Sequence, residues 1–226
     1  MKNNRNILIA AIVATAVIFA GVYYFQKPEA SILTSNNSKE EKQTQAEESV
    51  SKQASTEIKP LASPITNAPS RITKKPFGIK IDPRTSPVQP EKFIGYHTGT
   101  DFETTSEEAK QDVKIFALCT GKLLQKRTAS GYGGVVVQAC SINNQVVTVV
   151  YGHIDLSSVT DSVGQELNTG DPIAILGDAG PETDGERKHL HLGIHKGSTI
   201  NIKGYVQSSS ELSEWIDYKS LGIDAD

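Results

Sequence analysis

The stretch Lys188-His189-Leu190-His191-Leu192-Gly193-Ile194-His195 decides how this chain is interpreted. It alternates strictly, with leucine or isoleucine at positions 190, 192 and 194 and histidine or glycine at the odd-numbered positions from 189 to 195. A period of two predicts a β-strand whose apolar side packs on a core. The other side carries a row of imidazoles, so the alternation predicts one buried face and one chemically distinctive face.

The spacing of these histidines limits which of them can share one metal ion. Residues two apart on a strand lie about 6.6–7 Å apart, whereas metal–imidazole bonds are about 2 Å long. A metal bound by either His189 or His191 leaves the other beside it, aimed at a water or a substrate. His195 lies about 13 Å beyond His191 and is predicted to be out of reach. The alternative is a strand whose histidines merely line a solvated face.

The composition points to an exported protein rather than a nucleic-acid-binding one. The net charge of the 226 residues is −3, and the lack of a basic excess argues against nucleic acid as the main partner.

Lys2 and Arg5 precede an uncharged apolar run, Ile7–Phe25, which is about 28 Å long as a helix and matches the thickness of a bilayer. We predict a membrane anchor over residues 1–27, which makes the chain a single-pass protein with its domain on the extracytoplasmic side. The alternative is a cleaved signal peptide and a secreted domain.

Residues 28–76 are predicted to form a disordered polar linker. They are rich in Ser, Thr, Gln, Glu, Lys, Ala and Pro and contain no aromatic residue, so they bury too little apolar surface to offset the entropy of ordering. Such a segment is typical of a tether, and the alternative is a docking or inhibitory segment. We therefore place the folded domain at residues 77–226.

The folded part reads as short strands punctuated by glycine. Closely spaced strands with little helical periodicity predict an all-β, antiparallel domain. The segment Ser208–Leu221 is predicted as a short helix or a packed tail. The predicted strands are Val113–Leu118, Gly121–Arg127, Gly134–Ser141, Gln145–Tyr151, Pro172–Leu176 and Leu190–Ile194.

The only two cysteines, Cys119 and Cys140, fall nearly opposite each other on paired strands if the hairpin turns within residues 127–132. Export permits oxidation, and we predict a disulfide, with two buried thiols as the alternative. Neither cysteine has a second one at zinc-finger spacing, which argues against structural zinc.

Two further motifs carry the remaining histidines. His97 and Asp101 stand four residues apart around Gly99, so a tight turn can bring both side chains to one ion. His153 follows an apolar strand in Tyr151-Gly152-His153. Each motif alone is a weak signal, and their combination with the histidine strand is a strong one.

Together and in this order, the motifs resemble those of the lysostaphin/LytM-type zinc metallopeptidases, bacterial enzymes that cut peptide bonds in peptidoglycan. That family carries a His-x-x-x-Asp, a Tyr-x-His and a His-x-His on a β-rich scaffold. The resemblance covers about residues 93–196 and includes the Gly131-Tyr132-Gly133 turn and Val163-Gly164-Gln165. It implies a LytM-like metallopeptidase domain.

The resemblance also implies the role of each site residue. His97, Asp101 and His191 would be the ligands of one Zn²⁺ per chain, with water or substrate in the fourth position. His153 and His189 would be the catalytic pair that moves protons and stabilises the tetrahedral intermediate. The sequence contains no His-Glu-x-x-His, the motif of another zinc peptidase class.

Two departures from the family pattern bear on specificity. The family often reads His-Leu-His-Phe-Glu, whereas Gly193 here removes a side chain from the cleft face. The charged loop Glu182–Lys188 stands where the family commonly has a short Gly-Pro approach. Neither departure removes a predicted ligand.

These observations predict a membrane-tethered zinc endopeptidase acting on peptidoglycan stem peptides or cross-bridges. One alternative is a catalytically silent scaffold that activates other cell-wall hydrolases. Another is a zinc peptidase that cuts a protein substrate. The sequence leaves the oligomeric state and the bond cleaved open.

Overall fold

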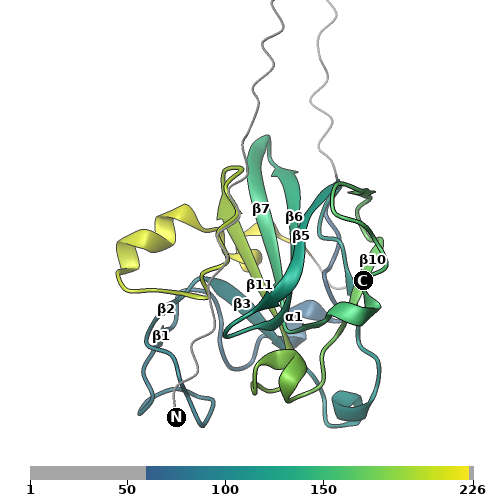
Figure 1. The fold of residues 1–226 in the computed structure, drawn as a ribbon. Helices are drawn as coiled ribbons and strands as arrows, with labels where there is room; N and C mark the ends of the chain where they lie inside the picture. Colours follow the sequence, from purple (N-terminus) through teal and green to yellow (C-terminus); the bar gives the residue numbers. More distant parts are fainter. Residues whose placement is uncertain (1–59, 224–226) are drawn as a thin grey trace, which may run out of the picture. The chain divides into compact units, whose positions relative to one another are not determined.

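The computed structural model describes residues 60–223, which form a β-rich domain (Figure 1). Every strand pairing in this part of the chain is antiparallel, so the predicted fold class is confirmed. The largest sheet has six strands in the order β3-β11-β7-β6-β5-β9. Two three-stranded sheets, β1-β2-β12 and β4-β10-β8, complete the fold.

The elements are short apart from the four central strands of the large sheet. The strands are β1 (Lys80–Ile81), β2 (Gly95–His97), β3 (Gly99–Glu103), β4 (Lys114–Phe116), β5 (Gly121–Ala129), β6 (Gly133–Ile142), β7 (Gln145–Gly152), β8 (Ile154–Asp155), β9 (Glu166–Leu167), β10 (Pro172–Leu176), β11 (His189–Lys196) and β12 (Tyr205–Val206). The helices are α1 (Ala68–Arg71) and the 3-10 turns η1 (Glu107–Lys110), η2 (Leu156–Ser158), η3 (Pro181–Thr183), η4 (Ser209–Glu214) and η5 (Tyr218–Leu221).

All six predicted strands are present, with bounds within two residues of those predicted. The missed strands, β1, β2, β3, β8, β9 and β12, have two to five residues each and are too short to show a period. The predicted helix or tail at 208–221 forms two 3-10 turns. Trp215 and Tyr218 are buried there, so the tail is packed against the domain.

The histidine strand β11 lies inside the large sheet, between β3 and β7. Its apolar residues Leu190, Leu192 and Ile194 are 0–1% exposed and belong to the main core, as the alternation predicted. The opposite face is covered as well, because Tyr132, Val150 and neighbouring residues form a second apolar cluster there. The histidines of β11 are therefore buried, and the alternative of a solvated face is wrong.

The predicted boundary between linker and domain at residue 77 is wrong. Residues 60–76 are folded onto the domain, where Ile65 and Ala68 are fully buried in the main core and Leu61 and Ile72 pack against it. The rest of the predicted linker and the predicted anchor lie outside the described residues. Within residues 60–223, no helix is long and apolar enough to cross a membrane.

Cys119 and Cys140 form a disulfide, as predicted. Cys140 lies on β6 and Cys119 in the turn that leads into β5, with their Cα atoms 5.9 Å apart. The bridge ties the turn before β5 to the strand that pairs with β5.

Candidate metal centre

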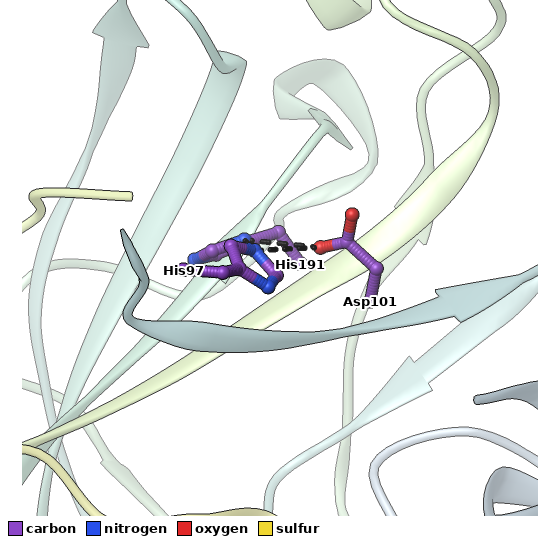
Figure 2. A group of neighbouring side chains, drawn as sticks. All are labelled: His97, Asp101 and His191. Atoms are coloured by element: carbon purple, nitrogen blue, oxygen red, sulfur yellow. Dashed lines mark hydrogen bonds and ion pairs between the residues drawn. The ribbon is translucent and has the colours of Figure 1, made fainter. Parts of the chain in front are cut away.

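Three strands bring His97, Asp101 and His191 together (Figure 2). On the large sheet, Asp101 of β3 is the antiparallel partner of His191 on β11, so both side chains project from the same face. His97 ends β2, and the chain passes through Thr98 directly into β3. Gly99 lies against the ring of His191, and a Cβ there would come within 2.5 Å of His191 Nε2, so this approach requires glycine.

The three donor atoms are spaced as ligands of one metal ion. His97 Nε2 lies 3.0 Å from His191 Nδ1 and 3.3 Å from Asp101 Oδ1, and His191 Nδ1 lies 3.1 Å from the same oxygen. Bonds of about 2.0–2.1 Å at tetrahedral angles would place neighbouring donors about 3.3 Å apart. All three side chains are at most 5% exposed, and converging lone pairs in such a buried place favour a cation between them. The set therefore fits a Zn²⁺ site with two imidazoles and one carboxylate.

Backbone groups of residues 60–76 hold these candidate ligands in place. His97 Nδ1 lies 3.2 Å from the carbonyl oxygen of Pro76, a contact that places the ring proton on Nδ1 and leaves Nε2 free for the metal. The amide of Asp101 donates to the carbonyl oxygen of Lys75 at 3.0 Å. Residues 60–76 thus contribute to the site as well as to the core.

The other two predicted residues, His153 and His189, form a pair beside this cluster. Their ring centroids are 4.2 Å apart. His189 Nδ1 lies 2.8 Å from the carbonyl oxygen of Arg187 and donates to it, which leaves Nε2 facing the cluster, 3.2 Å from Asp101 Oδ2. His153 stands at a positive φ of 62°, and its Nδ1 is buried without a hydrogen-bond partner. An unpartnered buried nitrogen in a strained backbone is typical of a functional position.

The protonation states suit metal binding and proton transfer. Burial lowers the pKa of His191 to about 4, despite the opposing effect of Asp101. Burial likewise lowers the pKa of His153 well below its ordinary value, and the charge of His189 adds to this effect. For Asp101, burial raises the pKa, but the charges of His189 and His97 outweigh it and hold the pKa well below its usual range. Asp101 is therefore ionised and His191 and His153 neutral at pH 7, the forms that can bind a metal or accept a proton.

Asp101 and His191 of the cluster and both histidines of the pair line one cavity of about 390 Å³. Two residues that line this cavity, Tyr132 and Arg187, were not among the site residues predicted from the sequence. Tyr132 presses edge-on against His191, with ring centroids 5.2 Å apart, and its hydroxyl is buried without a partner. Arg187 binds the second oxygen of Asp101 at 2.9 Å. Tyr132 belongs to the Gly-Tyr-Gly motif noted above, whereas a single arginine in a charged loop gives no pattern to detect.

His195 is excluded from the site, as its distance along the strand predicted. Its ring packs edge-on against Trp215 with centroids 4.8 Å apart. Trp215 also covers Gly193, where an added Cβ would meet the indole at 3.2 Å. The space beside Gly193 is therefore occupied by Trp215 of the C-terminal tail.

A buried set of metal-ligand residues that opens onto a cavity, with two further imidazoles beside it, is the arrangement that metal-dependent hydrolases use. Residues 95–202 match Peptidase family M23, a stretch that contains all five predicted site residues. This match confirms the resemblance to the lysostaphin/LytM-type peptidases that was inferred from the sequence.

The chain is similar to several individual proteins. Endolysin 2638A of Staphylococcus phage 2638A is 26% identical over 139 residues, which cover 54% of this chain and 27% of the endolysin. Among solved structures, LytU is 24% identical with a TM-score of 0.45, covering 66% of this chain and 82% of that one. The catalytic domain of the antimicrobial peptidase lysostaphin from Staphylococcus simulans is 19% identical with a TM-score of 0.44, covering 70% and 98% respectively.

Proposed function

We propose that the protein is a zinc metallo-endopeptidase that hydrolyses peptide bonds in peptidoglycan stem peptides or cross-bridges. The observation that carries this proposal is the convergence of three donor atoms within 3.3 Å of one another beside the His153–His189 pair. The match of residues 95–202 to Peptidase family M23 supports peptide-bond hydrolysis, and similarity to an endolysin supports a cell-wall substrate.

His97, Asp101 and His191 would hold one zinc ion, with the cavity giving access to the fourth position. A bound zinc ion supplies Lewis acidity, which polarises the scissile carbonyl and lowers the pKa of an attacking water molecule. Two neutral imidazoles and one carboxylate leave a net positive charge at the ion, which suits that chemistry better than a thiolate-rich set would.

The His153–His189 pair would handle the protons. A neutral imidazole accepts the proton of the attacking water, and the protonated ring then donates to the leaving amine. Burial lowers the pKa of His153, so its ring is in the neutral form, which can accept a proton. The hydrogen bond from His189 Nδ1 to Arg187 fixes the tautomer whose Nε2 faces the reaction site.

Tethering to the membrane is the second part of the proposal. It is supported by the apolar run Ile7–Phe25, which has the length of a membrane span and follows Lys2 and Arg5. With such an anchor the domain would face the cell wall from the extracytoplasmic side of its own membrane. If the anchor is cleaved, the domain would instead be secreted.

The test is digestion of purified peptidoglycan by the zinc-loaded full chain, with newly freed amines identified by mass spectrometry. We expect new amines from the wild type and from His195→Ala, an imidazole variant outside the site, but none from His189→Ala. Stoichiometric zinc without new amines on several peptidoglycan types would reject the endopeptidase and direct attention to a scaffold role. New amines from a protein substrate alone would reject the cell wall as the target.

A further inference from the structure

We infer that Arg187 is a positioning residue of the metal centre, which holds one oxygen of Asp101 so that the other faces the two ligand histidines. The inference rests on the proposed zinc site and adds to it a residue from the charged loop 182–188, where the chain departs from the family pattern.

The two oxygens of Asp101 are divided between different partners. Oδ1 is the oxygen that lies 3.1 Å from His191 Nδ1 and 3.3 Å from His97 Nε2, and it points at the rings in Figure 2. Oδ2 lies on the other side, where Nη2 of Arg187 donates to it at 2.9 Å and His189 Nε2 lies 3.2 Å from it. A carboxylate held by its outer oxygen cannot rotate freely, so it offers a single fixed oxygen to the metal. If Asp101 binds the metal through one oxygen only, the fourth coordination position stays free for water or substrate.

Arg187 is itself held rigidly. Its Nε donates to both oxygens of Glu103, at 2.9 and 3.1 Å, and its NH2 donates to Glu103 as well as to Asp101. Glu103 stands two residues after Asp101 on β3 and therefore projects from the same face. Lys74 contacts the outer side of Glu103 at 3.3 Å. The side chains of Arg187 and Glu103 are only 18% and 10% exposed, so solvent screens this network weakly.

The backbone of Arg187 also forms a hydrogen bond with one histidine of the predicted catalytic pair. Its carbonyl oxygen accepts the Nδ1 proton of His189 at 2.8 Å. One residue therefore contacts a predicted metal ligand through its side chain and a predicted catalytic histidine through its main chain. A shift of this loop would move both groups together.

Whether removal of Arg187 weakens or tightens zinc binding distinguishes a positioning role from simple charge repulsion. The guanidinium is a positive charge close to the site of a dication, so by Coulomb's law alone its removal would tighten zinc binding. If Arg187 acts by holding Asp101, its removal frees the carboxylate to rotate and weakens binding, by about 10- to 100-fold for groups of this kind.

The experiment is a zinc-affinity titration of the full chain against a competing chelator. We expect Arg187→Met to weaken zinc binding about 10- to 100-fold, and Arg187→Lys to fall between it and the wild type, because a single ammonium cannot serve Asp101 and Glu103 together. Lys188→Met is the matched control, since the Lys188 ammonium binds Asp178 and the carbonyl of Gln111 and touches no predicted ligand. We expect its zinc affinity to stay within about twofold of the wild type.

A double-mutant cycle shows whether Arg187 acts through Asp101. In an Asp101→Asn background, which keeps one oxygen donor but replaces the oxygen that Arg187 binds with an amide NH2, Arg187→Met is expected to cause no further loss of zinc affinity. Thermal unfolding of the metal-free proteins shows whether each variant is folded. If Arg187→Met does not fold, the zinc affinity of Arg187→Lys is compared with that of the wild type instead.

Unchanged or tighter zinc binding by folded Arg187→Met, or equal losses with and without Asp101, would overturn the inference and leave the proposed function standing. A wild type that binds no zinc would overturn both.

Discussion

His153 adopts a backbone conformation that side-chain-bearing residues avoid, with a φ of 62° directly after β7. The left-handed region costs such a residue about 1–2 kcal/mol, and that cost persists where the surrounding structure imposes it. The fold imposes it here through the carbonyl of His153, which accepts the amide of Gly177 at 2.8 Å. The imidazole is thereby directed towards His189.

The first prediction concerns His153→Asn. Asparagine tolerates the left-handed region better than most residues, so the fold should persist while the proton-transferring ring is lost. We expect kcat to fall by about 10²- to 10⁴-fold, with zinc affinity within a few-fold of the wild type. Steady-state kinetics together with a chelator titration measure both. A loss of zinc affinity as large as the loss of kcat would make His153 part of the metal site instead.

The second prediction uses two histidines on the same strand and the same face. His191→Ala removes a proposed ligand, and we expect stoichiometric zinc binding to be lost. His195→Ala removes an imidazole that contacts Trp215 instead of the site, so zinc binding should be unchanged. Metal analysis after gel filtration compares the two. Zinc retained at full stoichiometry by His191→Ala would contradict the proposed ligand set.

At the scale of elements, the segment from 60 to 76 joins the core and the site although its composition is that of a linker. Its apolar residues Leu61, Ile65, Ala68 and Ile72 are separated by three or four positions and all pack on the core. Apolar residues at that spacing indicate a buried segment. The Ser, Thr and Pro residues between them give the segment a linker-like composition, which is why the sequence predicted a linker. Arg71 completes the anchoring, because it donates to both oxygens of Glu108 at 2.7 Å.

The third prediction is a pH-dependent contribution from this ion pair. Hydrogen bonds from Arg71 lower the pKa of Glu108 from 4.5 to about 2. Because the folded-state pKa is the lower one, the stabilisation is fully present above pH 4.5 and is lost as the pH falls towards 2. Because solvent screens this partly exposed pair, Glu108→Gln should lower the free energy of unfolding at pH 7 by about 1 kcal/mol, with the difference vanishing near pH 2.

Urea unfolding at several pH values measures this difference. Glu166→Gln, at an exposed carboxylate that makes no ion pair or side-chain hydrogen bond among the described residues, is the control and should leave the pH profile unchanged. A stability loss for Glu108→Gln that is the same at pH 7 and pH 2 would show that the ion pair is not its source.

The sequence was enough to predict the long strands and the histidine motifs, but not the contacts that surround them in the folded domain. The long strands showed their period, and the three histidine motifs could be assembled because each combines rare residues at fixed spacing. The contact between Gly193 and Trp215 could not be predicted, because the two residues meet only in the folded structure. Arg187 was missed for the same reason, since its importance comes from Asp101 and Glu103 on another strand.

At the scale of the whole domain, the disulfide and the predicted metal site lie in different regions. Cys119 and Cys140 are 21 residues apart, and in the chain-entropy model a bridge over such a loop adds about 3 kcal/mol. Neither residue lines the cavity that contains the predicted site.

The fourth prediction is that stability and activity respond separately to this bridge. We expect the double variant Cys119→Ser, Cys140→Ser to lose about 3 kcal/mol of unfolding free energy, while zinc affinity and kcat at 25 °C stay near wild-type values. Urea titrations of the oxidised wild type, the reduced wild type and the variant provide the comparison. Equal midpoints for all three would mean that the bridge contributes nothing to stability.

The predicted ligands are far apart along the chain, and this separation bears on how the protein is made. His97 and His191 are separated by 94 residues, so no pocket for zinc exists until β11 has been synthesised and paired with β3. Contacts of such long range form late and slowly. Zinc would therefore be captured by a nearly finished domain instead of guiding its folding. The kinetic consequence is a fifth prediction: adding zinc should leave the refolding rate of the metal-free protein unchanged and slow its unfolding, as stopped-flow fluorescence of Trp215 would show.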